Sequence, residues 1–331
     1  MKKLFILLVV FGLIGLAPFL LSSDFWLNAV LLTLYAALLG QSWNILGGYG
    51  GQFSFGHTLF FGVGAYTVAV LQVQLGINPW FGFIFGGLLA GLVAVTMGFL
   101  TFRYGLRGSY FALVTLAFAE VFRILSNSIW WTGAGEGILM PLDQRAVMMQ
   151  FTSLAWYFWL IWAITLACFL VVWRLERSRF GARLMAVRDN EDAASAIGVN
   201  ALAVKLQAMA LSGMFTGFAG VFYAQRYLYL DPGIAFGPSV SVESLLVPIV
   251  GGLGTLFGPL LGAAALNAVA ELAREVIGDA PGLNMIVYGS VLVGMVMFLP
   301  RGLAGLGQIS ICRLFKGSQI KGSDFKGNHD A

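Results

Sequence analysis

Long uncharged apolar stretches alternate along the chain with short segments that hold most of its charges. A helix that crosses about 30 Å of hydrocarbon needs roughly 20 apolar residues, and in lipid its backbone hydrogen bonds must be made within the segment. The pattern therefore predicts an all-α integral membrane protein with about ten transmembrane helices. The predicted spans are 4–21, 26–46, 57–75, 80–101, 109–128, 154–174, 206–225, 240–251, 256–274 and 284–299. The eighth is too short to cross the membrane without help.

Composition supports this interpretation. Hydrophobic residues make up 59% of the chain and charged residues only 10%, so a water-soluble fold of this size could not cover its surface. The spans use most of the 331 residues, which leaves no room for a separate soluble catalytic domain. We predict one membrane domain, 1–305, with a cytoplasmic loop at 175–205, followed by a polar, disordered cytoplasmic tail, 306–331. Cys168 and Cys312 suggest neither a metal cluster nor a bridge.

The basic residues predict the orientation, because cytoplasmic loops retain Lys and Arg. With ten alternating spans, Lys2, Lys3, Arg103, Arg107, Arg174–Lys205 and Arg301–Lys326 fall on one side, and Glu136, Asp143, Asp231 and Asp279 on the other. Arg145 and Arg226 are exceptions. Both termini are therefore expected in the cytoplasm. The first apolar run resembles a signal peptide, but Leu20–Asp24 is a poor cleavage site, which favours a retained span.

The longest basic segment, Arg174–Lys205, predicts two short helices outside the membrane. Phe180, Leu184 and Val187 lie at helical spacing on one face, with Arg179 and Arg183 on another. Asp189 or Asn190 can then cap a second helix, whose first turn holds Glu191 and Asp192, and Gly198 can end it. A loop packed on the membrane surface would also fit. A docking element for a partner is favoured, because a capped, charged pair of helices is more structure than a connection needs.

Two glycine-rich stretches predict interrupted helices at membrane depth. In Asn44–His57, five glycines accompany the polar residues Gln52, Ser54 and His57. Irregular backbone is tolerated in a membrane only where protein or water covers it, so this stretch is expected to line a pathway. For His57 alone, simple satisfaction by a neighbouring carbonyl is an equal alternative.

The second stretch is Glu243–Thr255. Pro248 removes a helix hydrogen bond and a glycine cluster follows it, which predicts another discontinuous helix. Glu243 is a candidate for gating or for meeting a polar substrate, and an interfacial carboxylate exposed to water is an equal alternative. Gly47–Gly50 and Gly251–Gly254 resemble one another, which is weak evidence for duplication. Glu120 and Arg123 are expected to pair within the bundle.

These segments together resemble the branched-chain amino acid class of ABC importer permeases, of the M-subunit type, over roughly residues 25 to 305. The cytoplasmic loop carries the resemblance through Arg179-Phe180-Gly181, Ala186-Val187-Arg188-Asp189-Asn190-Glu191, Ala193-Ala194 and Gly198. Asn44–Tyr66 and Glu243–Gly262 extend it. The resemblance implies the bundle of a type II importer permease in the cell inner membrane. It also implies that the loop inserts into a groove on an ATPase subunit.

The expected functional residues form two sets. For ATPase docking they are Arg179, Phe180, Gly181, Arg183, Ala186, Arg188, Asp189, Asn190, Glu191, Ala194 and Gly198. For the translocation pathway they are Asn44, Gly51, Gln52, Ser54, His57, Glu243 and Gly252. The partners implied are two ABC ATPase subunits, a second homologous permease subunit, an external or periplasmic amino-acid-binding protein and the lipid bilayer, with no nucleic acid.

Missing motifs bound the function further. The chain has no G-x-x-x-x-G-K-[ST] loop, no His-x-x-x-His or Cys-x-x-Cys pair and no nucleophile beside an evident base. We therefore expect a transport subunit that is not an enzyme and holds no cofactor, with ATP used by its partners. By resemblance its substrates are branched-chain or related hydrophobic amino acids, moved by alternating access. The alternatives are a permease for urea or short amides in the same family, and a self-sufficient secondary carrier or channel.

Overall fold

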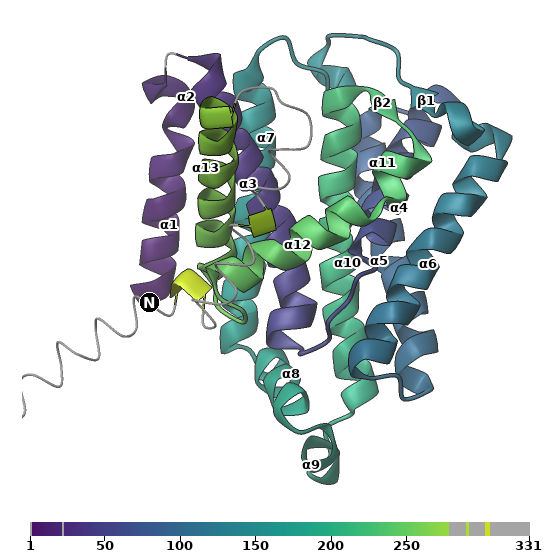
Figure 1. Ribbon diagram of the computed structural model, residues 1–331, viewed down its shortest axis with the longest axis vertical. Coiled ribbons are helices and arrows are strands. Elements are labelled where there is room, and N and C mark those ends of the chain that lie inside the picture. The colour runs from purple at the N-terminus through teal and green to yellow at the C-terminus, as the bar shows by residue number, and fades with distance from the viewer. Residues whose placement is uncertain (1, 22, 278–288, 291–301, 305–331) are drawn as a thin grey trace, which may run out of the picture.

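The computed structural model describes residues 2–21, 23–277, 289–290 and 302–304, and helices dominate this part of the chain (Figure 1). The α-helices are α1 Lys2–Gly15, α2 Ala17–Leu20, α3 Asp24–Asn44, α4 His57–Val73, α5 Pro79–Arg103, α6 Gly108–Ser128, α7 Leu154–Arg177, α8 Arg179–Asp189, α9 Glu191–Ala196, α10 Ala201–Tyr227, α11 Pro232–Phe236, α12 Pro238–Gly251 and α13 Gly258–Ile277. Short 3₁₀ turns cover Trp130–Thr132, Ala134–Glu136 and Ala146–Met148.

The predicted spans from 26–46 to 256–274 each coincide with one of these helices, and the span 4–21 is divided between α1 and α2. The span 284–299 lies almost entirely outside the described residues. Among the described residues, seven helical segments are long and apolar enough to cross a membrane. They are Lys2–Leu20, Asp24–Tyr49, Pro79–Arg103, Gly108–Ser128, Leu154–Arg177, Ala201–Tyr227 and Pro232–Gly251. His57–Val73 and Gly258–Leu272 are apolar but shorter. The sequence thus located the apolar helices, although not all of them are full-length spans.

Small residues bring three helices into close contact at the centre of the bundle. Along α5, Gly82, Gly86, Ala90, Ala94 and Gly98 recur every fourth residue, lie on one face and are all buried. This face packs on α4 and α10. In a membrane, where lipid is as apolar as leucine, such stripes let helix backbones approach and gain van der Waals contact.

The backbones of α4 and α10 are equally close. A Cβ atom on Gly64 would overlap the carbonyl oxygen of Gly217, and one on Gly220 would overlap that of Phe61. These glycines are needed because the opposing atoms are backbone, which cannot rotate away. The α4–α5–α10 block is therefore packed with backbone against backbone.

The first span is not one continuous helix. The chain breaks at Leu16, and Pro18, which has no amide hydrogen to donate, occupies the first turn of α2. On the other side of the break α1 packs against α7, where the indole Nε1 of Trp162 donates to the carbonyl oxygen of Phe11 at 2.9 Å.

Two features lie at the end of the molecule opposite α8 and α9 (Figure 1). The strands β1, Ile138–Leu139, and β2, Tyr229–Leu230, form an antiparallel pair that the sequence pattern did not predict. Nearby, the guanidinium of Arg145 hydrogen-bonds the carboxylate of Asp143 and thereby holds the pKa of that acid below its ordinary value. This basic residue, an exception to the charge pattern, is thus neutralised locally.

The other exception, Arg226, is also satisfied where it stands. Its Nη2 donates to Asn28 Oδ1 at 2.7 Å, and the guanidinium lies 5.5 Å from the ring centre of Tyr157. Glu120 and Arg123 form the expected pair through two hydrogen bonds of 2.6 and 2.9 Å. However, both side chains are partly exposed on the surface of α6, whereas the sequence had suggested the bundle interior.

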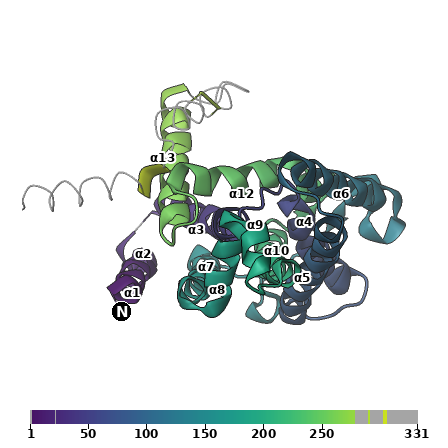
Figure 2. The same ribbon diagram turned by 90° about the horizontal axis from the view of Figure 1, so that it is seen from below.

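The helical structure is interrupted twice within the bundle. After α3 a π-helical turn, Ile45–Tyr49, leads into irregular backbone, and α4 begins only at His57. Figures 1 and 2 show α12 running across the bundle, from the side of α4 and α6 to the lower end of α13. The second interruption lies between the end of α12 at Gly251 and the start of α13 at Gly258. The glycine cluster interrupts the helix as predicted, whereas α12 continues through Pro248, which had been expected to contribute to the break.

Candidate functional site

The helices α8 and α9 form a projection from the bundle beyond the lower ends of α7 and α10 (Figures 1 and 2). Each begins with a side-chain cap: Ser178 Oγ accepts from Gly181 N at 3.0 Å, and Asn190 Oδ1 accepts from Ala193 N at 2.9 Å. Leu184 and Val187 are buried beneath α8, as their spacing predicted. Gly198, with φ at +87°, follows the end of α9. This α8–α9 projection is thus a folded unit.

The structure separates the residues expected to dock an ATPase into three groups. Arg179, Arg183, Arg188, Asp189, Asn190 and Gly198 are exposed, Phe180, Ala186 and Glu191 are partly buried, and Gly181 and Ala194 are buried. Gly181 is packed so closely that a Cβ atom there would overlap the carbonyl oxygen of Leu175. The buried members therefore shape the projection, and the exposed ones form its surface.

A hollow of about 350 Å³ lies between α8 and the start of α10. Its lining includes Phe180 and Arg183 from one side and Ile197, Asn200 and Gln207 from the other. Ile197 is 80% exposed. The surface of the projection thus combines a cationic group with apolar groups around a concave centre.

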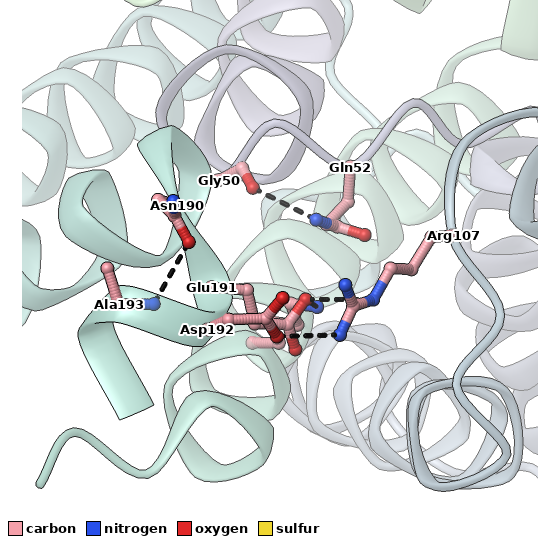
Figure 3. A network of polar contacts seen from close by, with 8 residues as sticks. Gly50, Gln52, Arg107, Asn190, Glu191, Asp192 and Ala193 are labelled. Atoms are coloured by element: carbon pink, nitrogen blue, oxygen red, sulfur yellow. Dashed lines mark hydrogen bonds and ion pairs between the residues drawn. The ribbon is translucent and has the colours of Figure 1, made fainter. Parts of the chain in front are cut away.

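An ion-pair network attaches α9 to the bundle (Figure 3). The ammonium of Lys205, on α10, donates to Glu191 Oε2 at 2.7 Å, and Arg107, before α6, reaches the same oxygen at 3.2 Å. Arg107 also lies 3.6 Å from Asp192. The Lys205 side chain is only 3% exposed, so its charge depends on Glu191 for compensation. Glu191 is therefore engaged within the protein, where it fixes the position of α9.

Arg188 attaches α8 to the first glycine-rich stretch. Its Nη1 donates to the carbonyl oxygen of Gly48 at 3.2 Å, and its Nε donates to the neighbouring Asp189 carboxylate at 3.0 Å. Gly51, with φ at +68°, lies directly against the arginine stem: a Cβ atom there would be 2.5 Å from Arg188 Cγ. Glycine at this position both permits the backbone conformation and leaves room for the arginine.

The two glycine-rich stretches meet in space. A Cβ atom on Gly48 would be 2.6 Å from Gly254 N, so the two backbones are in contact. Asn44, at the end of α3, joins them: its Oδ1 accepts from Gly254 N at 2.8 Å, and its Nδ2 donates to Thr255 O at 3.1 Å. Asn44 is completely buried. It was expected in a pathway, and the structure places it as the connection between the interruptions.

Ser54 and His57 lie in a buried hydrogen-bond network between α3, α4 and α10. Ser212 Oγ donates to Ser42 O at 2.7 Å and therefore accepts from His57 Nε2 at 2.8 Å. The partner of His57 is thus a hydroxyl, where a carbonyl had been one of two expectations. No described group hydrogen-bonds its Nδ1. Ser54 accepts from Trp43 Nε1 through its carbonyl oxygen at 2.8 Å.

The remaining pathway candidates differ in exposure. Gln52, partly buried, donates to the carbonyl oxygen of Gly50 at 3.3 Å (Figure 3). Glu243 is partly buried on α12 and lies within electrostatic reach of Tyr35 on α3. Gly252 is buried with φ at +128°, a conformation that L side chains rarely adopt. The described residues contain no group of three His, Cys, Asp or Glu side chains that could hold a metal ion.

Several polar residues that build this region were not singled out from the sequence. Thr58 N donates to Ser241 Oγ at 2.9 Å and thereby ties the start of α4 to α12. Ser212 and Thr216 stand four apart on α10, which places them on one helix face, and this polar pair within an apolar helix is a signal that could have been used. Lys205, a charged residue on the same apolar helix, could have been singled out in the same way.

Comparisons with known proteins show which proteins this chain resembles. Residues 25–296 match the family model described as branched-chain amino acid transport system / permease component. The chain is 30% identical over 312 residues to the high-affinity branched-chain amino acid transport system permease protein LivM of Escherichia coli, covering 86% of this chain and 71% of that protein. It is 29% identical to the L-arabinose ABC transporter permease protein AraH of Azospirillum brasilense, over 72% and 68% of the two chains.

A more distant relative is the autoinducer 2 import system permease protein LsrC of Yersinia pseudotuberculosis, 24% identical over 71% of this chain and 68% of that protein. No solved structure matches the chain significantly. These relatives are permeases of import or transport systems, and the substrates in their names differ.

Proposed function

Because the chain belongs to the permease family of branched-chain amino acid transport systems, we propose that it carries branched-chain or related hydrophobic amino acids as a subunit of an ATP-driven importer. Membership makes it a multi-pass permease of the inner membrane, a transport component rather than an enzyme, and it needs no cofactor of its own. It also implies ATPase and binding-protein partners. The complete proposed assembly adds a second homologous permease and contains two ATPase subunits.

The α8–α9 projection is the observation that supports ATP-driven transport most directly. It lies on the side that carries most of the basic residues, which is the cytoplasmic side by the positive-inside rule. Arg179, Phe180 and Arg183 offer cationic and aromatic groups around a concave surface, and such groups are enriched in the anchors of protein interfaces. In the proposal an ATPase subunit binds here, and closure of the ATPase pair on ATP moves the projection.

The transport mechanism in the proposal is alternating access. Ten spans, with both termini cytoplasmic, form a type II bundle in which the interrupted helices provide the parts that move. Glu243 and the stretch around Gly51 and Gln52 face the substrate route. Amino acids are favoured over sugars as substrates because the two LivM relatives align over more of the chain than the arabinose and autoinducer permeases.

A docking experiment tests the ATP-driven part. The permease is expressed with its genomic partners, purified through a tag, and the co-purifying ATPase is quantified. Reversing one exposed charge on the projection, Arg183→Glu, is expected to reduce the ATPase recovered at least tenfold. Arg145→Glu, the same change at the opposite end of the molecule, is the matched control and retains full recovery. Equal recovery with both variants would contradict the docking assignment.

Transport itself separates the remaining alternatives. Proteoliposomes with the whole complex and its binding protein are expected to accumulate leucine, isoleucine or valine only when ATP is present on the side of the membrane where the ATPase lies. Uptake by the permease alone, driven by an ion gradient, would instead establish a secondary carrier. Competition by arabinose or urea for the binding protein would move the substrate assignment to another class.

A further inference from the structure

We propose that Arg188 is the positioning residue through which movement of α8 reaches both interrupted helices. This rests on the proposed function, since it assigns the route by which a docked ATPase acts on the membrane domain. Three segments that are distant in sequence meet at one place: residue 188 on the projection, the stretch around Gly48, and the stretch around Gly254.

Arg188 bonds the first interruption and lies beside the second. Its Nη1 bonds the carbonyl oxygen of Gly48 at 3.2 Å, and the same nitrogen would be 3.4 Å from a Cβ atom on Gly254. Its stem fills the space beside Gly51. The guanidinium therefore lies over the junction where the backbones of the two glycine-rich stretches touch.

The junction is bonded so that it can move as a unit. Asn44 bonds the amide of Gly254 and the carbonyl of Thr255, and it lies one turn before Gly48 on the same continuous backbone. A displacement of Gly48 is thus transmitted to the second stretch by backbone contact and by two hydrogen bonds. From there α12 leads across the bundle toward α4, as Figure 2 shows.

The geometry requires a guanidinium and not merely a positive charge. Arg188 donates to the Gly48 carbonyl with Nη1 while Nε and Nη2 bond Asp189 at 3.0 and 2.9 Å. An arginine can make these bonds together because its donors are held in one plane, whereas a lysine ammonium is a single point charge without a planar fork of donors. Asp189 thereby orients the arginine from its own helix.

The second attachment of the projection acts elsewhere. Glu191 and Lys205 tie α9 to α10, and Arg107 ties it to the start of α6, all outside the junction. Removing Arg188 therefore leaves the projection held to the bundle while it removes the hydrogen bond from α8 to Gly48; the packing of Leu184 beside Gly50 remains. This makes the two roles, docking and transmission, separable by substitution.

The test uses the purified complex of permease, partner permease and ATPase, with three variants. Arg188→Gln and Arg188→Lys remove the bond to Gly48, and Arg103→Ala removes an exposed cytoplasmic arginine at the end of α5 as a matched control. The Arg188 guanidinium is bonded within the chain to Gly48 and Asp189 and does not line the hollow, so the docking role expected for it from the sequence is replaced in this proposal. We therefore expect both Arg188 variants to co-purify with ATPase at the wild-type ratio and to lose at least tenfold in ATP-driven uptake. The control is expected to transport normally.

Spin labels then report the movement directly. In a background with Cys312→Ser, one pair joins Ala182→Cys on α8 to Tyr110→Cys on α6, and the other joins Val242→Cys on α12 to the same α6 position. All three sites are exposed. In the wild type, ATP is expected to shift both distance distributions. In Arg188→Gln it shifts only the α8 pair.

The outcomes distinguish the two levels of inference. If ATP shifts neither pair in the wild type and no ATPase co-purifies, the proposed function fails. If the wild type responds and Arg188→Lys transports like it, or if α12 still moves in Arg188→Gln, the transmission role of Arg188 is overturned while ATP-driven transport stands.

Discussion

The ion pair between Glu191 and Lys205 gives a quantitative test of how α9 is held. At 2.7 Å, two unit charges attract by about 6 kcal/mol if the effective dielectric constant is about 20. The net effect is smaller, because desolvation of both groups opposes it. Replacing Glu191 by Gln keeps a hydrogen-bond acceptor but leaves the ammonium of Lys205, 3% exposed, without its counter-charge.

We expect Glu191→Gln to lower the free energy of unfolding by about 2–3 kcal/mol, somewhat below the usual cost of breaking a fully buried pair, because the Glu191 side chain is 22% exposed. The measurement is SDS-induced unfolding in mixed micelles, followed by tryptophan fluorescence. Asp192→Asn is the matched control on the next residue: its side chain is 86% exposed, so it should cost less than about 0.5 kcal/mol.

A double-mutant cycle isolates the pair. Lys205→Met removes the buried ammonium, so adding Glu191→Gln to it should cost about 2 kcal/mol less than the same change in the wild type. A coupling energy below about 0.5 kcal/mol would show that the pair does not stabilise the attachment of α9. It would also favour the role in ATPase docking that the sequence predicted for Glu191.

Three further predictions address packing, the glycine junction and topology. Gly64→Ala should lower the free energy of unfolding by about 2 kcal/mol because its methyl group meets the Gly217 carbonyl, whereas Gly12→Ala, with no atom within 4 Å, should not be destabilising in the same SDS titration. Gly51→Leu should abolish uptake in proteoliposomes while the protein still inserts, since its backbone has φ at +68° and Arg188 occupies the space; wild-type uptake would contradict the close packing there. Cysteine labelling in spheroplasts should modify Asp143→Cys from outside and Arg183→Cys only after permeabilisation, and the reverse pattern would invert the topology.

The apolar helices could be predicted because lipid imposes one requirement on every span. The observed ends of these helices differ by a few residues from the predicted ones where capping side chains determine them. For example, α10 begins at Ala201, five residues before the predicted start, because Asn200 caps it. Pro18 was visible in the sequence, but the sequence did not show that α1 ends at Gly15 and that a separate helix begins at Ala17. The pairing of β1 with β2 depends on segments about 90 residues apart, and no local pattern encodes it.

In the candidate site, too, local features could be predicted from the sequence and contacts between distant segments could not. Helix spacing placed Leu184 and Val187 beneath α8, and the asparagine at 190 provided the cap, because these are local effects. The meeting of Gly48 with Gly254, and the reach of Arg188 to both, result from how distant segments pack. The similarity of the two glycine motifs hinted at a relationship but carried no information about contact.

The contact between α4, α5 and α10 has a consequence for how the chain tolerates mutation. At Gly64 and Gly220 even one methyl group would overlap opposing backbone, and at Gly217 it would overlap the Cβ atom of Ala90. In contrast, Leu92, Leu113 and Val121 on the outer faces of α5 and α6 are exposed. A saturation library selected for expression should therefore leave these three glycines unchanged while the outer positions accept almost any apolar residue. In directed evolution of this permease, tolerated substitutions should therefore be found on the lipid-facing surface and hardly at all among the central helices α4, α5 and α10.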